Sequence, residues 1–145
     1  MTIKENIKLV ESDIYSILKN KVKERIEYLI NLGYSENLAR FFTDIDEDNT
    51  AVIWNDDKNS ITAILCYTIN DIDKGGVLIN FSYAKDAVSL EQVYNYFEKK
   101  VKALRCVYIN EHVPIKDHRR LTELENLSFE KKYYLLFKRV QNVTL

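Results

Sequence analysis

One stretch of the sequence, residues 75–110, constrains the fold most, because it has the pattern of a strand, a helix and a second strand. Its first part carries large apolar side chains at every second position, namely Val77, Ile79, Phe81 and Tyr83. This alternation is the periodicity of a strand. A short connection over 84–88 follows.

The middle of this stretch predicts a helix. Ser89 and Gln92 fit a capping box, which places the helix start at Ser89. Its apolar face consists of residues at helical spacing, namely Leu90, Val93, Phe97, Val101 and Leu104. The second strand is predicted over 105–109.

A helix that joins two strands in this way predicts that the strands are parallel neighbours with a right-handed crossover. The connection between the first strand and the helix then lies at the carboxyl end of that strand. Ligands of open α/β sheets usually bind at this end. Residues 84–90 are therefore the first place to expect a ligand.

Composition and charge exclude several classes of protein. A chain of 145 residues is expected to form one domain, 1–145, with a real core. Its 21 basic and 22 acidic residues nearly cancel, so we expect no nucleic-acid partner. No apolar run is long enough to span a membrane, and 1–6 lack a signal-peptide core, so we expect a cytoplasmic protein. Cys66 and Cys106 lack metal-ligand spacing and are expected to be free thiols, with no metal site.

The N-terminal part predicts a short strand over 7–10 and then two helices. Ser12 is the expected N-cap of the first helix, and Gly33 its C′ residue. Its apolar stripe comprises Ile14, Ile17, Leu18, Val22, Ile26, Leu29 and Ile30. Ser35 is expected to cap a second helix that ends near Phe42. The predicted buried side of that second helix consists of Leu38, Phe41 and Phe42.

An acidic segment, 44–49, precedes the strands. It matches the first half of a calcium loop, but position six is Asn49 and position twelve is Asn55, so a solvated loop is favoured. Two strands over 50–55 and 60–70 are then predicted to form a hairpin. Trp54 is expected to pack in the core or at an edge rather than bind a ligand.

The C-terminal part begins with a polar loop that contains His112 and His118, which are expected to be exposed. A helix over 116–127 follows, with Leu121 and Leu124 facing inward. The stretch 129–140 predicts a final strand that is covered on both faces.

The order of these elements resembles the GNAT superfamily of acyl-CoA-dependent N-acyltransferases. Three local similarities support this: the opening 7–14, the unit 75–110 at the place of the acetyl-CoA motif, and 121–138 at the place of the closing helix, Gly-Phe turn and strand. The resemblance implies an α+β fold with a mixed sheet, mostly antiparallel with one parallel strand pair, and helices on both faces.

The resemblance also implies an activity, the transfer of an acetyl or acyl group from CoA to an amine. Acetyl-CoA would be the donor, and a small-molecule or peptide amine the acceptor. The residues at the donor positions are Phe81, Ser82, Tyr83, Lys85, Ala87, Val88, Ser89 and Leu90. A slot for the pantetheine arm requires that the first strand of the unit splay away from the second.

The sequence departs from the family at three places. The pyrophosphate loop of the family carries glycines and a basic first residue, whereas 86–91 has neither. Ser89 would instead cap the helix, and Glu91 would repel phosphate. Leu124 stands where the family often has a proton-donating tyrosine, Ser128 stands for the usual glycine, and neither Asn80 nor Ser82 supplies a base.

Three interpretations follow. The protein is an acyltransferase with a degenerate donor motif, a non-catalytic binding or regulatory protein of the same fold, or an unrelated α+β domain. The sequence names no catalytic residue, no specific acceptor and no oligomeric state.

Overall fold

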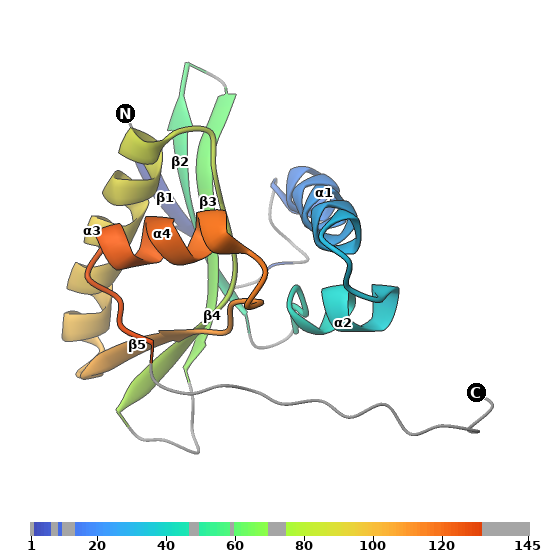
Figure 1. The fold of residues 1–145 in the computed structure, drawn as a ribbon. Coiled ribbons are helices and arrows are strands. Elements are labelled where there is room, and N and C mark those ends of the chain that lie inside the picture. The colour runs from blue at the N-terminus through green and yellow to red at the C-terminus, as the bar shows by residue number, and fades with distance from the viewer. Residues whose placement is uncertain are drawn as a thin grey trace.

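The computed structural model of the chain describes residues 2–6, 9, 14–46, 50–58, 60–69 and 75–131. These residues form a sheet of five strands with four helices around it (Figure 1). In chain order the elements are β1 Thr2–Asn6, α1 Tyr15–Asn31, α2 Glu36–Phe41, β2 Ala51–Asp57, β3 Ser60–Ile69, β4 Gly76–Ala84, α3 Ala87–Ala103, β5 Tyr108–Glu111 and α4 His118–Asn126.

The strands follow one another across the sheet in the order β1-β2-β3-β4-β5. The pairs from β1 to β4 are antiparallel, whereas β4 and β5 are parallel and joined by α3. The predicted fold class, a mixed sheet with one parallel pair, is therefore confirmed. The predicted hairpin is also confirmed as β2 and β3.

Helices cover both faces of the sheet, as predicted: α3 lies on one face and α1 with α2 on the other (Figure 1). Under α3 lies a core that includes Leu65, Val77 and Phe97, together with Leu124 from α4. Under α1 lies a second core that includes Leu18 and the predicted core residue Trp54; its buried members are Leu9, Ile14, Leu18, Val52, Trp54, Ile64, Cys66 and Phe81. The sheet thus carries an apolar layer on each side.

A β-bulge divides β4 into two halves. Cys66 pairs with Phe81 but Tyr67 pairs with Ile79, so Asn80 is an extra residue that has no partner on β3. Simple alternation would place Val77, Ile79, Phe81 and Tyr83 on one face. The extra residue reverses the alternation, so that Val77 and Ile79 join the core under α3, whereas Phe81 and Tyr83 join the core under α1.

The parallel pair is short. Its register runs from Gly76↔Tyr108 to Ile79↔Glu111, whereas β4 continues to Ala84. At its start the strands are very close, since a Cβ on Gly76 would lie 2.7 Å from Cε2 of Tyr108. A side chain at Gly76 would therefore displace that ring. The pairing stops because β5 ends at Glu111, and beyond Ile79 no described strand pairs with β4 on this side.

The first described strand spans Thr2–Asn6 and pairs with β2. Of the predicted strand over 7–10, only Leu9 is among the described residues, and it is buried with Leu18 in the core under α1. The described part of α1 begins at Tyr15, and the predicted cap Ser12 lies outside the described residues.

The ends of the first two helices are largely as predicted. Gly33 has a φ of 105°, the left-handed conformation expected at C′. The Ser35 side chain accepts a hydrogen bond from the Leu38 amide and caps α2. The prediction that Phe41 is buried is wrong: it is 51% exposed, because Ala39 is the residue of α2 that points inward. Ile17 and Ile30 also lie outside the core, so the apolar stripe of α1 is narrower than expected.

The C-terminal helix is also confirmed, with Leu124 buried and Leu121 half-buried. Ser128, at the place of the family's glycine, has a φ of 70°, so it adopts the left-handed conformation that glycine usually provides. Most of the predicted strand over 129–140 lies outside the described residues. None of the helices in the described part is long and apolar enough to cross a membrane.

Candidate active site

An open cleft of about 290 Å³ lies where β4 and β5 separate. Its walls are the second half of β4, residues 80–84, and residues 111–113 that end β5 and follow it. Side chains of α1 and α4 complete it, including Arg25 and Tyr28 from α1 and Asp117 and Arg120 from α4 and its cap. The Asn80 side chain lines this cleft, and its buried Oδ1 has no hydrogen-bond partner among the described residues.

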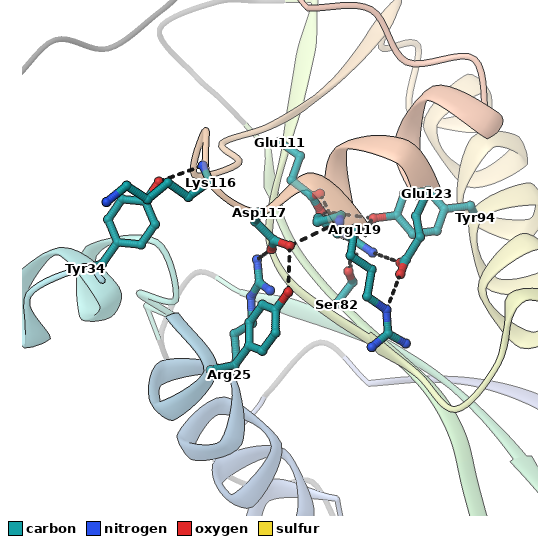
Figure 2. Close-up of polar contacts among 11 residues, drawn as sticks. Arg25, Tyr34, Ser82, Tyr94, Glu111, Lys116, Asp117, Arg119 and Glu123 are labelled. Carbon is teal, nitrogen blue, oxygen red and sulfur yellow. Dashed lines mark hydrogen bonds and ion pairs between the residues drawn. The ribbon is translucent and has the colours of Figure 1, made fainter. Parts of the chain in front are cut away.

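A polar cluster centred on Arg120 occupies the gap between the strands. Arg120 binds Glu111 in a bidentate ion pair, with Nε 2.9 Å from Oε2 and Nη2 2.9 Å from Oε1. Its Nη2 also donates to Ser82 Oγ on β4 and to the Tyr94 hydroxyl on α3. The Tyr94 hydroxyl donates to Glu111 Oε1 at 3.0 Å. Figure 2 shows Ser82, Tyr94 and Glu111 converging from three elements.

This cluster is buried and its protonation state is fixed. The side chains of Arg120 and Glu111 are 11% and 8% exposed. Burial, reinforced by the charge of Glu111, raises the pKa of Tyr94, so the phenol stays neutral. Burial also opposes the charge of Arg120, but Glu111 and Tyr94 beside it hold the pKa of Arg120 above its ordinary value. Arg120 therefore remains a cation, and Tyr94 a neutral hydrogen-bond donor.

A second buried carboxylate connects α1 to α4. The side chain of Asp117 is 1% exposed, and Arg25 Nη2 of α1 lies 2.5 Å from its Oδ2. The Tyr28 hydroxyl donates to Asp117 Oδ1 at 3.3 Å, and the Arg120 amide donates to the same oxygen at 3.2 Å (Figure 2). Asp117 is thus the N-cap of α4 and the anchor of α1. Burial, followed by the charge of Asp117, raises the pKa of Tyr28.

The predicted donor residues on β4 are divided by the bulge. Phe81 is 6% exposed and packs under α1. Lys21 Nζ lies over the ring of Tyr83, 4.3 Å from its centroid. Ser82 points the other way, into the Arg120 cluster. The side chains of the predicted set therefore do not form a single surface. What they share is the main-chain edge of β4, with which no described strand pairs beyond Ile79 on the β5 side.

The predicted donor residues at the start of α3 lie together. Lys85, Ala87 and Val88 are exposed, whereas Ser89 and Leu90 are buried at the first turn. The Lys85 amide donates a hydrogen bond to the Thr62 carbonyl at 2.9 Å, so it is not available to a ligand.

The prediction that Ser89 caps this helix is wrong. The helix begins at Ala87, and Asp86 is its N-cap, with Oδ1 2.8 Å from the Ser89 amide. This hydrogen bond from Ser89 lowers the pKa of Asp86, so the cap is ionised at neutral pH. A carboxylate competes with phosphate for a helix N-terminus, so the position predicted for phosphate is more acidic than expected.

Sequence reasoning missed six residues of the site: Arg25, Tyr28, Tyr94, Glu111, Asp117 and Arg120. Glu111 is the last residue of β5, and its place at the carboxyl end of a parallel strand is the signal that could have identified it. The others come from helices whose contacts only the fold reveals. His112 and His118 are exposed, as predicted. Across the described ranges, no three His, Cys, Asp or Glu side chains are grouped so that they would hold a metal ion.

Known structures with the same fold are acetyltransferases. YycN of Bacillus subtilis, a proposed acetyltransferase, has a TM-score of 0.69 at 14% identity, over 97% of this chain and 100% of that one. The aminoglycoside 6'-N-acetyltransferase AAC(6')-IG of Acinetobacter haemolyticus has a TM-score of 0.60 at 14% identity, over 97% and 99%. AAC(6')-Iy, an aminoglycoside N-acetyltransferase solved with CoA, has a TM-score of 0.61 at 9% identity, over 97% and 99%.

By sequence, the chain matches no protein-family model and no curated protein. The similarity is therefore one of architecture, and it extends over nearly the whole length of each structure. The order of the elements and the single parallel pair agree with it. The chain has the fold of the GNAT acetyltransferases.

Proposed function

We propose that this protein is an N-acyltransferase that moves an acetyl or other acyl group from CoA to an amine. The observation that carries the proposal is the separation of β4 from β5 after Ile79 and Glu111, beside an open cleft. A strand edge without a neighbour offers main-chain N–H and C=O groups to an extended ligand. The amide-containing pantetheine arm of CoA is such a ligand.

The polar groups of the cleft support this assignment. Asn80 lines the cleft, and its buried Oδ1 has no hydrogen-bond partner among the described residues, so it is an acceptor without a donor. A pantetheine N–H supplies such a donor. At the other end, the amides of Ala87 and Val88 open the first turn of α3, where phosphate oxygens would bind. Lys85 adds a positive charge beside them.

The proposed reaction needs few groups from the protein. The amine nitrogen forms a bond with the thioester carbonyl carbon, the carbon–sulfur bond breaks, and the proton lost by nitrogen balances the thiolate. An N–H on the free edge of β4 would stabilise the negative charge that develops on the carbonyl oxygen. Holding donor and acceptor together supplies much of the remaining rate enhancement.

The acceptor class follows from the cleft lining. Four acidic and four Lys or Arg side chains line the cleft: Glu24, Glu111, Asp117, Glu123, Lys21, Arg25, Arg119 and Arg120. The balance of charge favours neither a strongly anionic nor a polycationic acceptor. We propose a small-molecule or peptide amine. The aminoglycosides named for the structural neighbours are polycations, so they serve as a comparison for less charged amines rather than as the favoured acceptor.

A second candidate function is favoured by two observations. The Asp86 carboxylate occupies the helix N-terminus that phosphate would need, and Arg120 occupies the gap that pantetheine would need. A protein of this fold that has lost its donor would be expected to fill both places. Under this alternative the cleft binds another partner, and no acyl transfer occurs.

One experiment separates the two functions. Acetyl-CoA is titrated into purified protein while the melting temperature is followed, and thiol release is then measured with a panel of amines that includes an aminoglycoside and a peptide. Stabilisation that rises with donor concentration supports the acyltransferase. An unchanged melting temperature at millimolar acetyl-CoA, with no thiol release, supports the non-catalytic alternative.

A further inference from the structure

Arg120 bridges the two parallel strands at the point where their backbone pairing stops. The last main-chain pair is Ile79↔Glu111, and beyond it the strands are joined through side chains. The guanidinium of Arg120 contacts Ser82 on β4, Glu111 at the end of β5 and Tyr94 on α3. One side chain from a fourth element, α4, thus closes the gap that the divergence opens.

Arg120 is held in the gap by a buried ion pair with Glu111, which balances its charge. Both hydrogen bonds from the Arg120 guanidinium to Glu111 are 2.9 Å long, and the side chains of Arg120 and Glu111 are 11% and 8% exposed. Bidentate Arg–carboxylate pairs are strong and geometrically specific. A buried partner left alone is strongly unfavourable. Arg120 therefore leaves this position only when other groups replace its contacts or when Glu111 moves with it.

We propose that Arg120 is a latch on the donor slot, and that acyl-CoA binds only to the form in which the latch is open. This inference rests on the proposed acyltransferase function and concerns its regulation. The latch and a pantetheine arm need the same space, beside Ser82 between the separated strands. The two are therefore mutually exclusive.

The latch is connected to the side of the cleft that α1 forms. The Arg120 amide donates to Asp117, and Asp117 is held by Arg25 and Tyr28 of α1. A shift of α1 therefore changes the position of the first turn of α4, which carries Arg120. An acceptor that binds against α1 would bias the latch through this connection, so donor and acceptor binding would be coupled.

Because acyl-CoA binds only to the open form, its apparent affinity is the affinity of that form multiplied by the fraction of molecules that are open. A minor open state populated at roughly 10% or less weakens binding about tenfold or more.

The informative variant carries Arg120→Met with Glu111→Gln, because it removes both charges and leaves neither unpaired. The matched control, Arg40→Met with Glu36→Gln, makes the same two changes in an exposed pair on α2.

Two measurements are made on the full chain. Acetyl-CoA affinity is determined by calorimetry for wild type, the latch variant and the control. In wild type, hydrogen exchange of the Arg120 Nε–H is followed by NMR, with and without saturating acetyl-CoA. We expect binding to be at least tenfold tighter for the latch variant, unchanged for the control, and accompanied in wild type by faster exchange of the Nε–H.

The failures of the two proposals are distinguishable. If wild type binds acetyl-CoA while the Arg120 Nε–H exchange is unchanged at saturation, the latch is overturned and the acyltransferase proposal stands. The latch is equally overturned if a folded latch variant binds no more tightly than wild type. If neither wild type nor the latch variant binds acetyl-CoA, the acyltransferase proposal itself is overturned, and the latch with it. Binding by the latch variant alone supports both.

Discussion

Replacing Asp117 tests whether α1 is anchored to α4 as the structure indicates. Asp117 performs two tasks, since its Oδ1 caps α4 through the Arg120 amide and its Oδ2 pairs with Arg25. Asparagine is a good N-cap but has no charge. Asp117→Asn therefore removes the ion pair and keeps the cap, whereas Asp117→Ala removes both.

The magnitudes follow from burial. Breaking a buried ion pair from one side costs about 3–5 kcal/mol. The Arg25 side chain is 23% exposed, so water partly compensates it, and we expect about 2 kcal/mol for Asp117→Asn. Loss of the cap adds about 1 kcal/mol, so Asp117→Ala should cost about 3 kcal/mol.

The assay is urea unfolding followed by circular dichroism. For a small protein, about 3 kcal/mol corresponds to a midpoint lower by roughly 1–3 M urea. A double-mutant cycle with Arg25→Met should give a coupling of about 2 kcal/mol. Glu36→Gln, in an exposed pair on α2, is the matched control and should change stability by less than about 0.5 kcal/mol. If Asp117→Asn is equally harmless, α1 is not held by this carboxylate and our description of the anchor fails.

Three further predictions concern the core, the donor site and the thiols. Phe97 is 0% exposed, so Phe97→Ala should destabilise the protein by about 3–5 kcal/mol in the same urea assay, and a loss below about 1 kcal/mol would contradict the packing of α3. Asp86→Asn keeps the cap of α3 and removes its charge, so acetyl-CoA affinity by calorimetry should rise roughly fourfold at low salt and less at high salt. Glu91→Gln, beyond the first turn, should have a smaller effect, and equal effects would move the phosphate site. Burial raises the pKa of Cys66, so iodoacetamide at pH 8 should modify half-buried Cys106 in the native protein and reach Cys66 only after unfolding, as peptide mass spectrometry can show.

The sequence predicted the framework because periodicity and helix-end signals are local. Alternation identified β4, and the apolar spacing identified α3 with Phe97 at its centre. Gly33 and Ser35 marked helix ends correctly because their backbone and hydroxyl chemistry acts within a few residues. The capping-box pattern pointed to Ser89, but Asp86 three residues earlier is the cap, and Ser89 is buried in the first turn.

The candidate site was less predictable because its key contacts join distant segments. Arg120 reaches Ser82 and Glu111, and no local pattern links these residues. The buried position of Asp117 likewise depends on where α1 lies. The first strand was placed over 7–10 because Leu9 is apolar, although that residue serves the core rather than the sheet.

The extra residue in β4 has a consequence for comparing this chain with others. Before Asn80 the odd-numbered side chains of β4 face α3, whereas after Asn80 the odd-numbered side chains face α1. If the strand kept all its residues but paired regularly through Asn80, Phe81 and Ser82 would exchange faces, and an aromatic ring would turn toward Arg120. Deleting Asn80 would instead leave a regular ladder in which Phe81 and Ser82 keep their present faces. Alignments of this strand should be counted outward from the bulge in both directions.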